Sequence, residues 1–303
     1  MTGRLTIGVD IGGTKTRVLA VDGDAHIVDD VEVLSSSWRG PLGDVEADAA
    51  GIVTLLRQQF GEATDDAAIA VGAHGCENTE QCEALQAALG ARVDGPIRVV
   101  NDSELIAPAM DARRAIGVVV GTGSIATARD DGGALVTAGG WGWILGDEGS
   151  APALVRDAAR DVLGDLDSGG ELDALGRALF AAFAVADQDA LALSLTQATD
   201  PDEWGRHAPL VFAAADAGSR LAQGVIARAG AELATLVHRL LRRGVTADAV
   251  TAGGSVIERQ PRLQTALREA LAESCPDLDL RILDKPPVYG ALALARDLDH
   301  TPD

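Results

Sequence analysis

The sequence has few cysteines, no long apolar run and few basic side chains, and each shortage excludes a class of protein. The three cysteines, Cys76, Cys82 and Cys275, form no CxxC pair. An odd number of scattered cysteines argues against a disulfide framework and against a compact zinc or cluster site, so we expect free thiols. No apolar run approaches the roughly 20 residues that span a bilayer, and no basic segment followed by an apolar core opens the chain. We therefore expect a cytoplasmic protein with no membrane partner.

Basic residues are outnumbered by acidic ones, 25 to 46, which gives a formal net charge of −21. Such a chain repels polyanions at long range, so nucleic acid is not an expected partner. With 303 residues, 47% of them hydrophobic, the chain can bury a substantial core. This length predicts about two domains.

Glycine is abundant, with 35 residues, and it marks an apparent internal repeat. Residues 7–24, IGVDIGGTKTRVLAVDGD, align without a gap with residues 116–133, IGVVVGTGSIATARDDGG, at an offset of 109. Each copy predicts a strand, a Gly-rich turn, a second strand, a D-G type turn and a third strand. Either a duplicated β-meander or chance matching of common residues explains the alignment.

Helical and strand patterns alternate after each meander. In the first half, residues 44–60 and 79–89 have helical spacing, and residues 69–75 and 97–102 are typical of buried strands. In the second half we expect helices near 150–164, 171–184, 219–243, 262–273 and 289–298, and strands at 249–254 and 280–283. This alternation predicts an α/β fold with mixed sheets, and two such units facing each other would create a cleft.

The turn of the first copy combines backbone freedom with polar side chains. Two glycines allow positive φ and expose successive N–H groups, and hydroxyl and ammonium groups follow them at Gly12, Gly13, Thr14, Lys15 and Thr16. Such a turn can hold phosphate oxygens. Asp10 would be repelled by those oxygens unless a divalent cation lay between them, which favours a bridging Mg²⁺. The alternative is an ordinary hairpin with a solvated lysine.

Two further Gly-rich turns follow buried strands. The turn of the second copy has amides and hydroxyls that could hold phosphate, at Gly121, Thr122, Gly123 and Ser124. A third turn joins a strand to a helix and could let backbone approach a nucleobase, at Gly253, Gly254 and Ser255. A plain tight connection would explain this third turn equally well.

Asp102 ends an apolar strand, where its carboxylate could accept a proton from an attacking hydroxyl. The same residue could instead cap the helix that follows. Trp141 and Trp143 could cover the apolar face of a sugar or fill the core. Glu148 could be a site carboxylate or an acid in the first turn of a helix, and its role stays open.

Taken together, these segments resemble the five-segment signature of the sugar kinase, actin and Hsp70 ATPase superfamily. The segments are DIGGTKT (10–16), VVNDSE (99–104), VVVGTGS (118–124), VTAGGSV (250–256) and PPVYGALALA (286–295). The block GGWGWILGDEGS (139–150) is similar to that of the N-acetylglucosamine kinases and the BadF/BadG ATPase family. The resemblance implies a two-lobed, actin-like (duplicated RNase H-like) ATPase fold with mixed β-sheets and a central cleft.

The resemblance also implies an organisation and a set of roles. The N-terminal lobe would span residues 1–111 and the C-terminal lobe 112–303, with the last helix, about 289–299, packing back on the N-terminal lobe. Asp10 would organise Mg²⁺, and Asp102 would be the catalytic base. The first two Gly-rich turns would hold the phosphates of ATP, and the third would hold its adenosine.

Sugar contacts carried over from the resemblance fall on Ser37, Trp38, His74, Gly75, Asn101, Asp102, Trp141 and Asp147. Two segments depart from the N-acetylglucosamine kinase pattern. The chain has SSSW (35–38) where an STNxW-like segment is typical, and AHGC (73–76) where a small serine-glycine strand end is typical. Ser36, Ser37 and His74 therefore change the hydrogen-bond donors of the sugar pocket. His74 either recognises a different substituent or has no role in specificity.

The sequence thus predicts an ATP-dependent sugar kinase that phosphorylates N-acetylglucosamine or a related amino sugar, taken to be at the 6-hydroxyl. A kinase of the same fold acting on glucosamine or another hexose is an alternative, and a homodimer is compatible with the resemblance. The rival from another class is a BadF-type ATPase that activates a partner enzyme through a shared iron–sulfur cluster. Cys76 and Cys82 are poorly placed for such a cluster.

Overall fold

The computed structural model describes residues 4–40, 43–112 and 114–299. They form two compact units. The first unit runs to Arg114 and includes Gly132–Leu135 and the segment from Leu283 onward; the second comprises Ala115–Asp131 and Val136–Ile282. Among the residues described, every helix is too short or too polar to cross a membrane.

The first unit is built on a mixed sheet of five strands in the order β3-β2-β1-β4-β5. The strands are β1 (Thr6–Ile11), β2 (Lys15–Val21), β3 (Ile27–Leu34), β4 (Ala68–Ala73) and β5 (Ile97–Asn101). The first three form an antiparallel meander, whereas β4 lies parallel to both β1 and β5. The carboxyl ends of β1, β4 and β5 therefore meet at one edge of the sheet.

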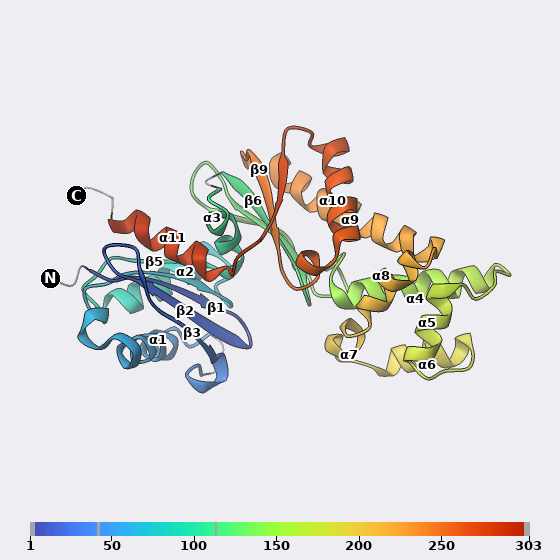
Figure 1. The fold of residues 1–303 in the computed structure, drawn as a ribbon, viewed down its shortest axis with the longest axis horizontal. Helices are drawn as coiled ribbons and strands as arrows, with labels where there is room; N and C mark the ends of the chain where they lie inside the picture. Colours follow the sequence, from blue (N-terminus) through green and yellow to red (C-terminus); the bar gives the residue numbers. More distant parts are fainter. Residues whose placement is uncertain (1–3, 41–42, 113, 300–303) are drawn as a thin grey trace. The chain divides into compact units, whose positions relative to one another are not determined.

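Helices cover both faces of this sheet (Figure 1). One face packs against α1 (Val45–Phe60) and α2 (Thr79–Gly90), which bury alternate residues of β1 such as Ile7 and Val9. The other face packs against α11 (Val288–Asp299) and α3 (Ile106–Ala109). Short 3₁₀ helices complete the unit: η1 (Ser35–Ser37), η2 (Gly61–Thr64) and η3 (Asp102–Leu105).

Glycine allows α11 to lie directly on the sheet. A Cβ on Gly8 of β1 would lie 2.5 Å from the backbone nitrogen of Leu292 and 2.9 Å from the carbonyl oxygen of Val288. A Cβ on Gly290 of α11 would lie 1.9 Å from the carbonyl oxygen of Leu105. Both contacts involve backbone atoms, which cannot rotate away, so the glycines set the distance between helix and sheet.

The second unit repeats this sheet. Its strands are β6 (Ala115–Val120), β7 (Ser124–Arg129), β8 (Leu135–Gly139), β9 (Ala249–Gly253) and β10 (Asp279–Ile282), in the order β10-β9-β6-β7-β8. Reversed, this order matches that of the first unit strand for strand. β1 and β6 begin and end at positions related by the sequence offset of 109. The predicted duplication of the meander is therefore confirmed, including the third strand of each copy.

Helices of the second unit pack on its sheet and on one another. They are α4 (Ala151–Asp167), α5 (Ala174–Ala182), α6 (Gln188–Gln197), α7 (Pro201–Gly205), α8 (Ala208–Asp216), α9 (Arg220–Arg242), η4 (Ile257–Arg259) and α10 (Pro261–Ser274). In Figure 1, α5, α6 and α7 lie together on the side of this unit away from its sheet. The sequence did not predict α6, α7 and α8. The apolar residues of α8 give no clean amphipathic pattern, because neighbouring helices bury Ala208, Val211 and Phe212 together with Ala214 and Ala215.

We predict that Gly8→Ala destabilises the protein, because the new methyl group meets the backbone of α11. The expected cost is about 2 kcal/mol or more, as for other overpacked cores. Denaturant unfolding measures this loss of the free energy of unfolding. Gly90→Ala is the matched control, since a Cβ there has nothing within 4 Å. Equal stability of the two variants would contradict the close approach of α11.

Candidate functional site

Three consecutive strand ends of the first unit bring predicted site residues into one row. Ile11 of β1 pairs with Ala73 of β4, and Ala73 pairs with Asn101 of β5. The residues that directly follow β1, β4 and β5 are Gly12, His74 and Asp102, respectively, and they therefore lie in one row. The N–H of His74 donates to the carbonyl of Ile11 at 2.8 Å, which extends the parallel pairing past the strand end.

Asp102 is held in place by a capping box. The Asn101 side chain accepts from the N–H of Ser103 at 3.0 Å, and Glu104 accepts from the N–H of Asn101 at 3.0 Å. Asn101 also donates its side-chain amide to the carbonyl of Cys76 at 2.9 Å. The helix cap is thus Asn101, and Asp102 is the first residue of η3. The N–H of Ser103 also donates to Oδ1 of Asp102 at 2.9 Å, and the carboxylate stays partly exposed.

Asp10 is the next-to-last residue of β1, is partly buried, and has surroundings that disfavour a negative charge on its carboxyl group. Burial raises the pKa of Asp10 to about 7, repulsion by Asp102 adds to the rise, and Arg17 opposes it. Asp10 lies on β1 next to β4, and Asp102 follows β5 on the other side of β4, at the same edge of the sheet. A cation bound there would relieve both the burial cost and the repulsion.

The first Gly-rich turn is closed by a hydrogen bond from the N–H of Gly12 to the carbonyl of Lys15, at 2.9 Å. Gly13 and Thr14 are exposed. Lys15 pairs with Glu32 on the neighbouring strand, but 60% of its side chain is exposed, so this pair is weak and the ammonium can reorient. Thr16, in contrast, is fully buried.

The Thr16 hydroxyl is occupied inside the fold. It lies 3.0 Å from the Ser35 hydroxyl, and the indole N–H of Trp38 donates to it at 3.1 Å. Ser35 in turn donates to the carbonyl of Gly12 at 2.9 Å. Trp38, Thr16 and Ser35 therefore form a hydrogen-bonded chain that ends on the backbone of the turn at Gly12. Ser37 is exposed, and its hydroxyl donates to the carbonyl of Leu34.

Some of the residues predicted to contact the sugar are already hydrogen-bonded inside the fold or are held there for their backbone conformation. Asn101 is buried, and both ends of its amide are used by the capping box and by Cys76. Gly75 has a φ of +93°, a conformation that glycine adopts without strain. His74 and Asp102, by comparison, keep partly exposed side chains.

In the second unit, the structure brings the other two Gly-rich turns together. Val119 of β6 pairs with Gly253 of β9, so the turns that follow these strands are neighbours. A Cβ on Gly121 would lie 3.4 Å from the Ser255 hydroxyl oxygen. Gly254 has a φ of +112°, and its N–H donates to the Glu258 carboxylate at 2.6 Å. Thr122 and Ser255 are exposed beside these turns.

The N-terminus of α4 adjoins the 121–124 turn. Ser150 caps α4, and the N–H of Ala151 donates to the carbonyl of Gly121 at 2.9 Å. The Ser124 hydroxyl donates to the carbonyl of Glu148 at 2.8 Å. The positive end of a 17-residue helix and the amides of the turn both favour an anion here.

Asp147 approaches the same turn. Its Oδ2 lies 3.0 Å from the position that a Cβ on Gly123 would occupy. A residue larger than glycine at position 123 would therefore crowd this carboxylate. Its Oδ1 is buried without a hydrogen-bond partner among the described residues. Burial raises the pKa of Asp147, and the backbone N–H groups of Ser124 and Gly142 oppose that rise. A buried, unpaired carboxylate oxygen suits a ligand hydroxyl.

The two tryptophans of the 139–150 block differ. Trp143 packs against Trp204 with ring centroids 4.9 Å apart, so it belongs to the core. Trp141 is 71% exposed and available to a ligand. Glu148 is not in the first turn of a helix, since α4 begins at Ala151, and that interpretation of Glu148 is wrong.

Arg156 of α4 is a residue that the motif analysis missed. It donates to the carbonyls of Trp143 and Gly146, the latter at 3.2 Å, and pairs with Asp157 at 2.9 Å. It thereby ties α4 to the loop that carries Trp141 and Asp147. A lone arginine within an amphipathic helix gives no sequence signal, because its carbonyl partners are set by the fold.

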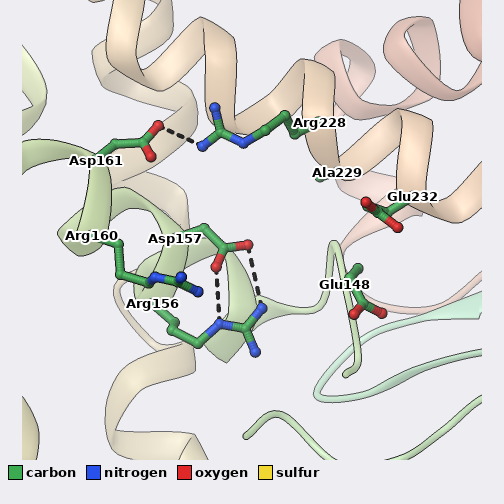
Figure 2. Close-up of a pocket in the computed structure, with 8 residues that line it drawn as sticks. All are labelled: Glu148, Arg156, Asp157, Arg160, Asp161, Arg228, Ala229 and Glu232. Carbon is green, nitrogen blue, oxygen red and sulfur yellow. Dashed lines mark hydrogen bonds and ion pairs between the residues drawn. The ribbon is translucent and has the colours of Figure 1, made fainter. Parts of the chain in front are cut away.

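Arg156 also lines a cavity of about 300 Å³ beside α4 and α9 (Figure 2). The lining residues are Glu148, Arg156, Asp157, Arg160, Asp161, Arg228, Ala229 and Glu232. Asp161 pairs with Arg228 across it at 2.5 Å. Of these lining residues, only Glu148 belongs to a sequence motif. The acidic side chains and arginines that line the cavity largely neutralise one another.

Metal and thiol chemistry are limited by the side chains that the fold brings together. Within the described ranges, no group of three or more His, Cys, Asp or Glu side chains could hold a metal ion. Mg²⁺ needs no such cage, because it keeps waters and binds through one or two carboxylates. The three cysteines are free and buried, which confirms the expected free thiols.

A family comparison agrees with this arrangement. The profile of the BadF/BadG/BcrA/BcrD ATPase family matches residues 7–295. The chain belongs to this family. Two curated relatives are an N-acetyl-D-glucosamine kinase from Dictyostelium discoideum, 27% identical over 97% of this chain and 98% of its own, and an N-acetylmuramic acid/N-acetylglucosamine kinase from Clostridium acetobutylicum. The latter is 31% identical, and its match spans about half of each chain, 55% and 56%.

A solved structure shares the fold of this family member. The Chromobacterium violaceum protein, provisionally assigned as an N-acetylglucosamine kinase, superposes with a TM-score of 0.65 at 24% identity, over 97% of this chain and 99% of its own. The predicted fold class, a duplicated actin-like ATPase fold with mixed sheets, is confirmed.

The raised pKa of Asp10 predicts that Asp10→Asn stabilises the ligand-free protein. A carboxyl whose pKa rises from 3.8 to about 7 on folding favours the folded state at low pH, and this contribution is lost as the pH rises through 7. The gain from asparagine should grow between pH 4 and 7 and then level off, at roughly 2 to 4 kcal/mol after allowance for partial exposure. Thermal unfolding across this pH range measures it.

Asp30→Asn is the control with the opposite sign. Arg17 holds Asp30 with two hydrogen bonds of 2.8 Å and lowers its pKa. Its stabilising contribution is present above the pKa of the unfolded chain and is lost on acidification, so this variant should be destabilised at neutral pH. Stabilisation by both substitutions, or by neither, would contradict the assignment of the Asp10 shift to burial and Asp102.

Arg156→Lys should loosen the loop that carries Asp147. Lysine cannot reproduce the planar fork that reaches two carbonyls. We expect amide hydrogen exchange of residues 142–146 to become about tenfold faster, the equivalent of one charge-assisted hydrogen bond. Arg160→Lys, an exposed position of the same helix and cavity, is the control. Equal exchange in the two variants would show that Arg156 does not hold the loop.

Proposed function

We propose that this ATPase-family member is a sugar kinase that transfers the γ-phosphoryl group of ATP to a hydroxyl, the 6-hydroxyl, of N-acetylglucosamine or a related amino sugar. The names of both curated relatives support this class of substrate. One observation carries the proposal. A capping box presents the Asp102 carboxylate one residue beyond a strand end, in the same row as the first Gly-rich turn.

Asp102 would accept the proton of the sugar hydroxyl as that oxygen attacks phosphorus. The hydroxyl then forms a bond to phosphorus, the bond from phosphorus to the leaving oxygen of ADP breaks, and the proton stays on Asp102. Positioning of the two reactants supplies much of the rate in such reactions. The rigid cap of Asn101 and Glu104 suits that demand.

The Gly-rich turns are proposed to bind the nucleotide. Gly12, Gly13, Thr14 and Lys15 would hold phosphate oxygens in the first unit, and Gly121–Ser124 would do so in the second. The N-terminus of α4 supports an anion beside the latter turn. We assign adenosine to the turn formed by Gly253, Gly254 and Ser255.

Asp10 is the proposed Mg²⁺ residue. The residues present fit this ion, since burial and the charge of Asp102 disfavour an ionised Asp10 more than Arg17 favours it, and a bound cation would relieve both effects. Bound Mg²⁺ would neutralise phosphate charge that develops during transfer. Its binding should release a proton from Asp10, because a ligand carboxylate must be ionised.

Sugar recognition is proposed for Trp141, Asp147 and the Asp102 carboxylate. The exposed Trp141 ring can cover the apolar face of a pyranose, and the unpaired Asp147 oxygen can accept a hydroxyl. Ser36 and Ser37 stand where an asparagine-containing segment is typical, so the sugar could differ from N-acetylglucosamine. Glucosamine and other hexoses are therefore included in the test.

Asp102→Asn should lower kcat by about 100-fold to 10,000-fold, the usual contribution of a general base, while nucleotide affinity changes little. Release of ADP in a coupled assay and calorimetric binding of ATP measure the two quantities. Asp24→Asn, in the exposed turn between β2 and β3, is the control. Turnover by Asp102→Asn at the wild-type rate would remove Asp102 from the role of base.

The substrate is tested by the same assay over glucosamine, N-acetylglucosamine, N-acetylmuramate, N-acetylmannosamine and glucose. We expect the highest kcat/KM for an N-acetylated amino sugar. ADP release that no sugar accelerates, together with visible absorbance of the purified protein, would favour a BadF-type activator instead. Light scattering measures whether the protein forms the homodimer with which the resemblance is compatible.

A further inference from the structure

His74 occupies the middle strand end of the row. β4 lies between β1 and β5, so the residue after β4 is flanked by the first Gly-rich turn on one side and by Asp102 on the other. Its backbone is fixed by the hydrogen bond to Ile11. The side chain is 44% exposed, which leaves part of the ring open to a ligand.

The two edges of the His74 ring face different neighbours. Nδ1 lies 3.7 Å from Oδ2 of Asp102. On the other edge, Nε2 and Cδ2 lie 3.7 Å from the position of a Cβ on Gly13. One ring nitrogen is therefore directed toward the proposed base, and the other toward the turn proposed to hold phosphate.

The surroundings of His74 favour a positive ring. Interaction with Asp102 raises the pKa of His74, and Glu77 adds to the rise; partial burial and Arg39 oppose it. An imidazolium has two N–H donors and no acceptor. Such a ring can donate on both edges at once, which a neutral imidazole cannot do.

We propose that His74 is a further catalytic residue, whose imidazolium donates from Nδ1 to the Asp102 carboxylate and from Nε2 to a terminal phosphate oxygen of ATP at the Gly12–Gly13 turn. This inference rests on the proposed function. During transfer the sugar proton passes to Asp102, the bond from phosphorus to ADP breaks, and His74 keeps both of its protons. Its charge stabilises the transferring group, and its Nδ1–H orients the base.

This role differs from recognition of a sugar substituent. A residue that reads the sugar should affect sugar KM and leave the nucleotide alone. A donor to the terminal phosphate should distinguish ATP from ADP, because ADP lacks the oxygen that it contacts. The comparison of the two nucleotides is therefore the decisive measurement.

His74→Gln tests the proposal, with His26→Gln as the matched control. His26 forms a similar ion pair, 3.6 Å from Asp22, but lies in the turn at the opposite end of β2 from the Gly-rich turn. By calorimetry with Mg²⁺ present, we expect His74→Gln to bind ATP about tenfold more weakly and ADP within about twofold of wild type. His26→Gln should bind both as wild type does.

Kinetics and magnetic resonance give independent readouts. We expect His74→Gln to lower kcat about tenfold or more with little change in sugar KM, and wild-type kcat to decline at high pH as the ring loses its proton. In wild type, the His74 resonances should shift on addition of ATP but not of ADP. Asp102→Asn should lower the pKa of His74 in the same spectra.

Three outcomes would overturn the inference: equal loss of ATP and ADP affinity relative to the control, a change confined to sugar KM, or His74 resonances that respond equally to both nucleotides. The wild-type spectra decide the matter even if His74→Gln folds poorly. Failure of the proposed function looks different. In that case wild type phosphorylates no sugar of the panel, while the preference of His74 for ATP can still be present or absent.

Discussion

Parallel pairing of β4 with both β1 and β5 is the constraint on which the first unit's candidate site depends. It aligns three strand ends, so that residues distant in sequence, Gly12, His74 and Asp102, follow one another along a single edge. The antiparallel β1–β2 turn then places its amides at the same edge. Close packing of α11 on Gly8 and of Leu105 against Gly72 holds these strands in position.

This alignment has an electrostatic cost. Two carboxylates, Asp10 and Asp102, are brought near each other, and Asp10 is desolvated as well. The chain tolerates a group whose ionised form disfavours the folded state, which is typical of a site arranged for a ligand rather than for stability. A cation that neutralises Asp10 would turn the same arrangement into a stabilising one.

The duplicated sheet is used differently in the two units. Position 10 of the first copy corresponds to Val119 of the second at the offset of 109, so the second copy keeps the glycine turn but has no carboxylate on its strand. In its place the second unit brings Asp147 from the loop before α4. Asp147 has a φ of +54°, which is costly for a residue other than glycine and is held by the loop around it. Arg156 is the side chain that ties this loop to α4.

Local sequence patterns indicated the repeated meander and predicted the mixed sheets and the chemical character of the turns. These features rest on local signals: glycine at fixed positions and alternation of apolar residues. The same patterns also indicated Asp10 and Asp102 as chemically active groups, and the family resemblance added Asp147. The helices α6, α7 and α8 were missed for different reasons. α7 has only 5 residues, and α6 buries only Leu191 and Leu195, so both give a short pattern. The residues of α8 are buried on several sides, which leaves weak periodicity.

Which polar side chains are free to bind a ligand depends on contacts between segments that are distant in the sequence. Thr16 and Asn101 have the right chemistry in sequence, yet their polar groups are taken up by Trp38, Ser35, Cys76 and Ser103. The contacts of His74 and Arg156 are also set by the fold. Strand register brings His74 close to Asp102, 28 positions away. Helix packing brings Arg156 close to Trp143 and Gly146, 13 and 10 positions away. A sequence specifies donors and acceptors, but whether each one is satisfied depends on contacts that form only when distant segments pack together.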